Sequence, residues 1–160
     1  MRLGLVAVGR LKAGAERDLA ERYGERAAAH ARALGLSGVE TREVAVSRAA
    51  RAEERRAEEA HAILAAMPAG ARLALLDERG QPLDSAQWAT DIGKARDGGA
   101  PAYVIVIGGP DGLDPSLRER AGVVVSFGRV TWPHALMRVL ATEQLYRALT
   151  ILGGHPYHRA

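Results

Sequence analysis

The stretch Ala102–Gly112, AYVIVIGGPDG, decides how the rest of the chain is interpreted. Its apolar run, 103–107, ends directly in two glycines, which is typical of a fully buried strand that closes in a tight loop. Asp114 and Pro115 follow, and they suit the N-cap and the first turn of a helix. A strand, a glycine loop and a helix start together indicate a ligand site at the carboxyl edge of a sheet, although a tight connection without a ligand fits the same residues.

Outward from this stretch, short apolar runs alternate with longer helical patterns. We expect strands at 3–8, 39–46, 72–77, 103–107 and 123–127, and helices at 15–34, 49–67, 85–96, 114–121 and 133–152. This order predicts an α/β fold in which a mostly parallel sheet carries helices on both faces. The 39–46 run is more polar than the others, so we expect it near an edge.

Three of the expected helices carry additional information. Asp84 and Gln87 have the spacing of a capping box at the start of the 85–96 helix. The charge run RAEERRAEE, 51–59, is typical of a solvated helix face. The last helix is apolar on nearly all sides, and in a chain this small we expect a subunit interface to supply the burial.

Composition bounds the class of protein. The 160 residues, 48% of them hydrophobic and 26% charged, fit one soluble globular domain. Without cysteine there is no disulfide framework and no thiolate nucleophile. No apolar run approaches the roughly 20 residues of a membrane span, and no signal peptide is recognisable, so we expect a cytoplasmic protein. The net charge of +3 permits nucleic-acid binding without requiring it.

Common nucleotide and hydrolase motifs do not account for the glycine loop. Gly108, Gly109 and Gly112 do not form G-x-G-x-x-G, and their loop follows the fourth expected strand rather than the first. The chain also has no phosphate-binding G-x-x-x-x-G-K-[ST] loop and no G-x-S-x-G elbow.

The C-terminal tail, GGHPYHRA, concentrates chemically active side chains at a position where chains are usually frayed. His155 and His158, together with His134, raise the question of a zinc site. Pro156 keeps the tail from being helical, so the histidine spacing has no geometric meaning and we expect no metal. The tail either works on a substrate or is docked for stability.

Five segments occur together in an order and spacing that resemble the RlmH family of SPOUT methyltransferases. They are LVAVG at 5–9, LLD at 75–77, IGGPDG at 107–112, WPHALMRVLATEQLYRA at 132–148 and HPYHR at 155–159. The resemblance covers the whole chain, and 13–71 matches mainly in pattern. Members of this family methylate N3 of a pseudouridine in the 23S rRNA of the large ribosomal subunit.

The resemblance implies a single SPOUT domain, 1–160, with a C-terminal trefoil knot in about 72–160. It also implies a homodimer that binds S-adenosylmethionine and acts on assembled ribosomes. Trp132 is bulkier than the family pattern leads us to expect. The cofactor-binding residues implied by position are Leu76, Gly108, Gly109, Phe127, Gly128, Arg129, Val130, Thr131, Trp132 and Pro133.

For catalysis we expect His134 and His158 to handle a proton or contact the base, and Tyr157 to stack on or orient it. Arg159 completes the catalytic set by contacting an anion, and the tail is expected to complete the pocket of a partner copy. Arg138 and His155 are expected to bind the substrate. Arg2, Arg10, Lys12 and Arg129 are candidates to face RNA. Two other hypotheses remain open: a SPOUT methyltransferase with another RNA target, and a non-catalytic ribosome-binding module.

Overall fold

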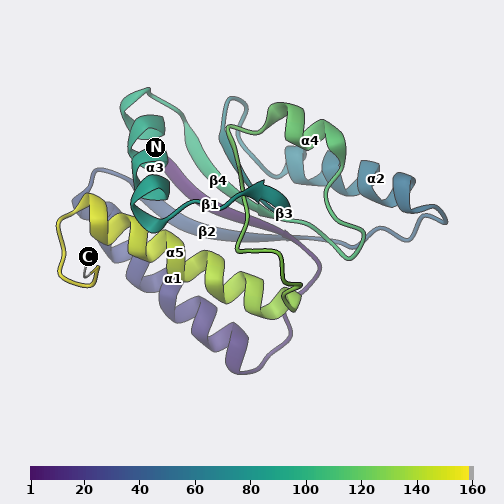
Figure 1. Ribbon diagram of the computed structural model, residues 1–160, viewed down its shortest axis with the longest axis horizontal. Coiled ribbons are helices and arrows are strands. Elements are labelled where there is room, and N and C mark those ends of the chain that lie inside the picture. The colour runs from purple at the N-terminus through teal and green to yellow at the C-terminus, as the bar shows by residue number, and fades with distance from the viewer. Residues whose placement is uncertain (159–160) are drawn as a thin grey trace.

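Strands and helices alternate along the chain in the computed structural model, which describes residues 1–158 (Figure 1). The strands are β1 (Arg2–Val8), β2 (Ser37–Val44), β3 (Arg72–Gln81), β4 (Ala102–Ile107) and β5 (Val123–Val125). The helices are α1 (Ala15–Ala33), α2 (Ala52–Ala65), α3 (Ser85–Asp97), α4 (Pro115–Arg120) and α5 (His134–Leu152).

The strands form one parallel sheet in the order β2-β1-β4-β3-β5. All six residues of β4 are buried at the centre of the sheet, as its apolar run predicts. β2 lies at an edge and has no buried residue, which explains its polar sequence. Because β4 is central, the glycine loop that follows it lies in the middle of the carboxyl edge.

Helices cover both faces of the sheet, which confirms the predicted α/β architecture (Figure 1). Side chains alternate along each strand, so Leu5 and Ile105 face α1, α3 and α5 on one side. Val6 and Val106 face α2 and α4 on the other side. The capping box of α3 forms as predicted, and Asp84 accepts a hydrogen bond from the Gln87 N–H at 2.7 Å.

The structure corrects the expectation that α5 needs a subunit interface for its burial. The helix packs between α1, α3 and the sheet, and residues such as Leu145 and Leu149 are fully enclosed within one chain. Leu136, in the first turn, is the large apolar side chain of α5 that remains exposed. The apolar composition of α5 therefore reflects packing inside the chain.

The charge run of α2 is only partly solvated, contrary to prediction. Glu59 is 3% exposed, and its Oε1 accepts the Ser47 N–H at 3.0 Å. Arg55 forms a two-point hydrogen-bonded pair with Asp111 at 2.7 and 3.0 Å. Both contacts exist because α2 packs against the end of β1 and the loop after β4, an arrangement that a local charge pattern does not report.

Strand β3 runs past the expected end at residue 77. Leu76 pairs with β4, then the register shifts, and Gln81 pairs with Val125 of β5. Gly80 passes so close to β5 that an added Cβ would lie 2.7 Å from the carbonyl carbon of Val125. Among residues 1–158, no helix has the length and apolar character needed to cross a bilayer.

Candidate functional site

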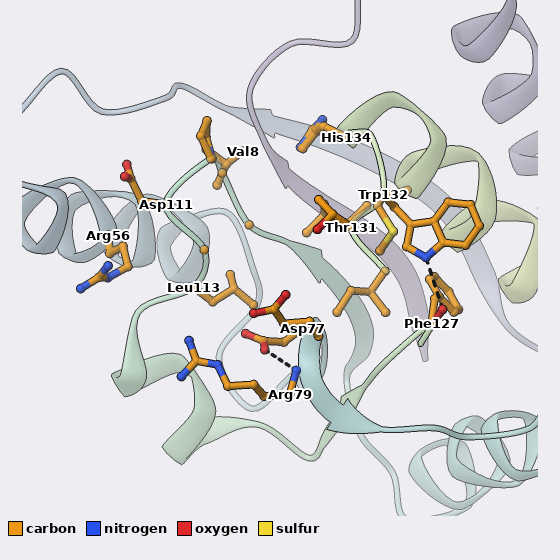
Figure 2. A pocket seen from close by; sticks show the side chains of 18 of the residues that line it. Val8, Arg56, Asp77, Arg79, Asp111, Leu113, Phe127, Thr131, Trp132 and His134 are labelled. Carbon is orange, nitrogen blue, oxygen red and sulfur yellow. Dashed lines mark hydrogen bonds between the residues drawn. The ribbon is translucent and has the colours of Figure 1, made fainter. Parts of the chain in front are cut away.

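A cavity of about 820 Å³ opens at the carboxyl edge of the sheet (Figure 2). Its lining comes from the ends of β1, β3, β4 and β5, from the loops that follow them, and from the start of α5. Leu76, Ile107 and Val125 contribute apolar surface, while Asp77 and Asp111 contribute carboxylates. The volume lies within the range of about 300–1,000 Å³ that is usual for small-molecule and cofactor sites.

Most residues that the sequence nominated for cofactor binding line this one cavity. They are Leu76, Gly108, Gly109, Phe127, Gly128, Val130, Thr131 and Trp132. Two nominated residues, Arg129 and Pro133, are exposed and do not contribute to the lining. The structure thus gathers segments that are more than fifty residues apart in sequence, from three loops that the resemblance nominated together.

Packing within the chain explains the first two glycines of the loop. A Cβ on Gly109 would lie 2.8 Å from Cγ1 of Val8 and 2.9 Å from Oε2 of Glu59. A Cβ on Gly108 would lie 2.9 Å from Cγ of Leu113. Gly112 has φ +83° and closes the turn by donating its N–H to the Gly109 carbonyl at 3.0 Å. The tight connection is therefore real, and its backbone also forms part of the cavity wall.

The loop after β5 is folded onto itself by side-chain hydrogen bonds. The Ser126 hydroxyl accepts the Gly128 N–H at 3.1 Å and lies 3.2 Å from the Glu78 carbonyl, to which it can donate. The indole N–H of Trp132 donates to the Phe127 carbonyl at 3.3 Å, as the dashed line in Figure 2 shows. These bonds fix the backbone of the loop beside the cavity.

The carboxylates of the cavity are compensated by arginines. Asp77 forms an ion pair with Arg118, and Asp111 forms the pair with Arg55. The hydrogen bonds from Arg55 hold the pKa of Asp111 below its ordinary value. Sequence reasoning missed Asp77, Asp111 and Arg118 as cavity residues, although Asp77 ends the expected 72–77 strand and Asp111 lies in the glycine loop, which was a usable signal.

His134 is the first residue of α5 and points its ring into this region (Figure 2). The ring lies beside the backbone of Val8, and Nε2 is buried and has no protein partner among residues 1–158. Burial lowers the pKa of His134, and the positive charge of Arg138 lowers it further. The ring is therefore neutral near pH 7, and Nε2 is available to accept a proton.

Arg138 lies inside the protein, in contrast to the expected role in substrate binding. Its side chain is 2% exposed, and it donates to the Glu43 carboxylate at 2.7 Å and to the Gly9 carbonyl. Glu43 also accepts the Leu11 N–H at 2.8 Å. In this arrangement Arg138 supports the β1–α1 loop and does not reach solvent.

The tail is docked on α5 and α1. The Tyr157 hydroxyl donates to Glu143 at 3.1 Å, and its ring lies 4.5 Å from the ring of Tyr146. His155 makes an edge contact with His30 at 4.8 Å between ring centroids. Nδ1 of His158 is buried without a protein partner among residues 1–158, and Arg159 lies outside the described residues.

Within one chain the tail and the cavity are far apart. Helix α5 has 19 residues and begins at His134 beside the cavity, and the tail follows its other end (Figure 1). The tail folds back along the helix as far as Glu143, which still lies nine residues, or about 14 Å of helix, from His134. The structure therefore brings His134 together with the nominated cofactor residues but does not bring His155, Tyr157 or His158 to them.

Comparison with known proteins gives a consistent family match. A family model described as "Predicted SPOUT methyltransferase" matches residues 1–158. Several relatives are named "Ribosomal RNA large subunit methyltransferase H". The one from Methylobacterium nodulans is 57% identical over 159 residues, which cover 99% of this chain and 98% of the relative. Those from Bradyrhizobium sp. and Rhizobium meliloti are each 56% identical, with full coverage of both chains.

Among solved structures, one match is the SpoU methyltransferase AviRb from Streptomyces viridochromogenes in complex with AdoMet. The two chains are 15% identical with a TM-score of 0.42, over 95% of this chain and 58% of that one.

Proposed function

This chain belongs to the SPOUT methyltransferase family, in the group named ribosomal RNA large subunit methyltransferase H, and from that premise we propose that it transfers a methyl group from S-adenosylmethionine to N3 of a pseudouridine in 23S rRNA. The observation that carries the proposal is the meeting of the nominated cofactor residues and His134 in one cavity. SPOUT membership also implies the trefoil knot, which we place in about 72–160, within a single domain.

The cavity suits S-adenosylmethionine by its size and by its mixture of apolar side chains and backbone. Leu76 and Gly108, with the loop segment 127–132, are the residues that would hold the cofactor. When bound, the cofactor supplies a methyl group that is already activated on a sulfonium. The chain must then position the acceptor base and help it to lose a proton.

His134 is the proposed proton acceptor for N3–H of the base. Its ring lies beside the backbone of Val8, its Nε2 has no protein partner within residues 1–158, and its depressed pKa keeps it unprotonated at neutral pH. Loss of the N3 proton leaves negative charge on the base, which a nearby cation stabilises. Arg159 of the tail is the proposed source of that cation, with His158 beside it.

Within its own chain the described part of the tail lies against Glu143 and Tyr146, nine and twelve residues beyond His134 and so about 14 and 18 Å along the helix. A homodimer that places each tail at the cavity of its partner resolves this separation. Val130, Trp132 and Leu136 expose apolar surface around the start of α5, where a second copy would pack. Each active site is then composite, with His134 from one copy and the tail from the other.

The proposed substrate is the assembled ribosome in the cytoplasm. A single domain of this size presents a small surface, so the shape of the folded rRNA must supply part of the recognition. The first test is transfer of labelled methyl groups to unmethylated 70S ribosomes, isolated large subunits and naked 23S rRNA. Label at a pseudouridine, mainly with assembled ribosomes, supports the proposal.

Two other outcomes of that assay favour the competing hypotheses. Cofactor binding without transfer to any of these substrates indicates another RNA target. Absence of both transfer and cofactor binding indicates a non-catalytic ribosome-binding module.

Mixing two inactive variants tests the composite site. His134→Gln removes the proton acceptor, and truncation after Gly154 removes the tail. Each variant alone is expected to be inactive, whereas random heterodimers pair an intact cavity with an intact tail and restore about a quarter of the wild-type activity. If the tail serves its own chain, mixing restores nothing. Because Tyr157 packs on Tyr146, circular dichroism and cofactor binding must first show that the truncated chain is folded.

A further inference from the structure

We propose that a rim of basic side chains around the mouth of the cavity binds the phosphodiester backbone of RNA. The inference rests on the proposed function and names the surface by which the substrate is held. The cationic rim consists of Arg10, Lys12, Arg48, Arg79 and Arg129.

These residues come from different loops but lie at the same edge of the sheet. Arg10 and Lys12 follow β1, and Arg48 follows β2. Arg79 lies in the irregular stretch of β3 between Leu76 and Gln81, where its register against β5 shifts, and Arg129 follows β5. Since all the strands are parallel, their carboxyl ends, and with them these cations, meet where the cavity opens.

The rim adjoins the cavity directly. Arg79 lines it, Arg10 follows the lining residue Gly9, and Arg129 lies between the lining residues Gly128 and Val130. A base that enters the cavity brings its own flanking phosphates with it. Those phosphates must therefore pass the loops that carry the rim.

The rim has no ion-pair partner among residues 1–158, although Arg10 lies close enough to Glu43 to help lower the pKa of that carboxylate. All five side chains are exposed, and none takes part in an ion pair or a side-chain hydrogen bond among residues 1–158. Three carboxylates near this edge are already paired: Asp77, Asp111 and Glu43 bind Arg118, Arg55 and Arg138. Glu78 is the exposed cavity carboxylate without such a pair. The exposed charges without an ion-pair partner at this edge are therefore mainly positive.

The loop that presents Arg10 and Lys12 is held in place by hydrogen bonds to β2 and to a buried side chain of α5. Gly9 donates its N–H to the Val44 carbonyl at 2.8 Å, and the Leu11 N–H bonds to Glu43 at 2.8 Å. The buried Arg138 binds both Glu43 and the Gly9 carbonyl. A loop fixed in this way loses little further entropy when its cations meet phosphates. Arginine and lysine at such positions suit a polyanion because each phosphate contact releases condensed counterions.

A matched pair of triple variants tests the rim. The rim variant is Arg10→Gln/Lys12→Gln/Arg48→Gln, whose members lie outside the cavity lining. The control is Arg32→Gln/Lys94→Gln/Arg120→Gln, which removes exposed cations at the opposite, amino edge of the sheet. Arg2, which the sequence nominated to face RNA, begins β1 at that same amino edge and is left unchanged. Both variants lower the formal net charge from +3 to zero, so a difference between them reflects position and not total charge.

Binding to unmethylated 70S ribosomes is measured by cosedimentation across a salt series, beside methyl transfer and cofactor binding. The rim variant is expected to reduce the slope of log K against log salt by about 2–3, at 0.7–0.9 per lost phosphate contact. The control is expected to keep the wild-type slope, and both variants are expected to bind S-adenosylmethionine normally.

Equal slopes for the two variants, or wild-type binding that does not depend on salt, overturn the inference. If the wild type transfers methyl groups but the two variants show equal slopes, the rim is rejected as the RNA-binding surface and the proposed function is unaffected. If the rim accounts for salt-dependent binding but no ribosomal substrate is methylated, the proposed function is rejected and the rim is retained as an RNA-binding surface.

Discussion

The two edges of the sheet are built differently. Near the amino ends of β3 and β4, the buried Tyr103 hydroxyl accepts the indole N–H of Trp88 at 2.9 Å and donates to Asp91 at 2.9 Å. Asp91 in turn binds Arg72, which also donates to the Gly122 carbonyl at 3.1 Å. Burial raises the pKa of Tyr103 far above its ordinary value, so this network stays protonated and closed.

Near the carboxyl edge, buried groups are left open, in contrast to the satisfied network around Tyr103. Nε2 of His134 and Oε2 of Glu59 are buried without protein partners among residues 1–158, and a cavity lies beside the histidine. Unsatisfied buried groups cost stability, so they are typical of places where a ligand or a reaction is accommodated. The hydrogen-bonded network around Tyr103 and the cavity therefore lie at opposite edges of the sheet, separated by the length of a strand.

The two tryptophans of the chain provide the largest test of this difference. Trp88 is fully buried in the amino-edge network, whereas Trp132 is 39% exposed beside the cavity. Trp88→Ala is expected to lower the free energy of unfolding by about 3–5 kcal/mol, because it removes a large core side chain and leaves Tyr103 without a donor. Trp132→Ala is the control, with a clearly smaller loss in urea unfolding. Equal losses of unfolding free energy in the two variants would contradict the difference between the two edges.

Two glycines test the same division by ligand binding. Gly109→Ala forces Cβ against Val8 and Glu59, so we expect a cost of about 1–3 kcal/mol and a displaced cavity wall that weakens binding of S-adenosylmethionine. Gly99→Ala, before β4, meets no atoms but has φ +76°, and costs about 1–2 kcal/mol of backbone strain. Calorimetric titration should find cofactor affinity reduced only by the first substitution. Unchanged affinity in both would show that the loop does not shape the site.

The smallest expected effect concerns the ion pair between Arg55 and Asp111. Arg55 lowers the pKa of Asp111 in the folded protein, so the pair stabilises the fold above the ordinary aspartate pKa of about 3.9 and is lost as the pH falls through the lowered value. Asp111→Asn should therefore be less stable than the wild type at neutral pH. In urea unfolding across a pH series, the difference should shrink towards zero in acid. A stability difference that does not change with pH would show that the substitution acts through the structure of the loop and not through the lost charge.

Local patterns predicted the elements of the fold well. The buried β4, the polar edge strand β2 and the capping box at Asp84 all follow from a few neighbouring residues. The order of the strands does not follow from them, because it depends on contacts between distant segments. The burial of Glu59 and Arg138 escaped prediction for the same reason, since a charged residue on a helix gives no sign of the face that tertiary packing will cover.

The position of the cavity could be predicted better than its composition. The cavity lies at the edge that the glycines after β4 indicated, and the resemblance to a known family pointed to the loop after β5. Within that loop Arg129 and Pro133 do not contribute to the lining, because a folded loop presents only part of its residues to a cavity. Tyr157 was nominated for a base and is packed on Tyr146 within its own chain.

Helix α5 has a consequence for how such an enzyme is handled. It keeps His134 and the tail of the same chain at opposite ends of 19 residues, so a lone polypeptide under the proposed arrangement holds two halves of different reaction centres. Specific activity then obeys mass action: it falls on dilution below the dissociation constant of the pair and recovers on concentration. Assays at enzyme concentrations below that dissociation constant would underestimate turnover, and a compound that separates the two copies would inhibit without entering the cavity.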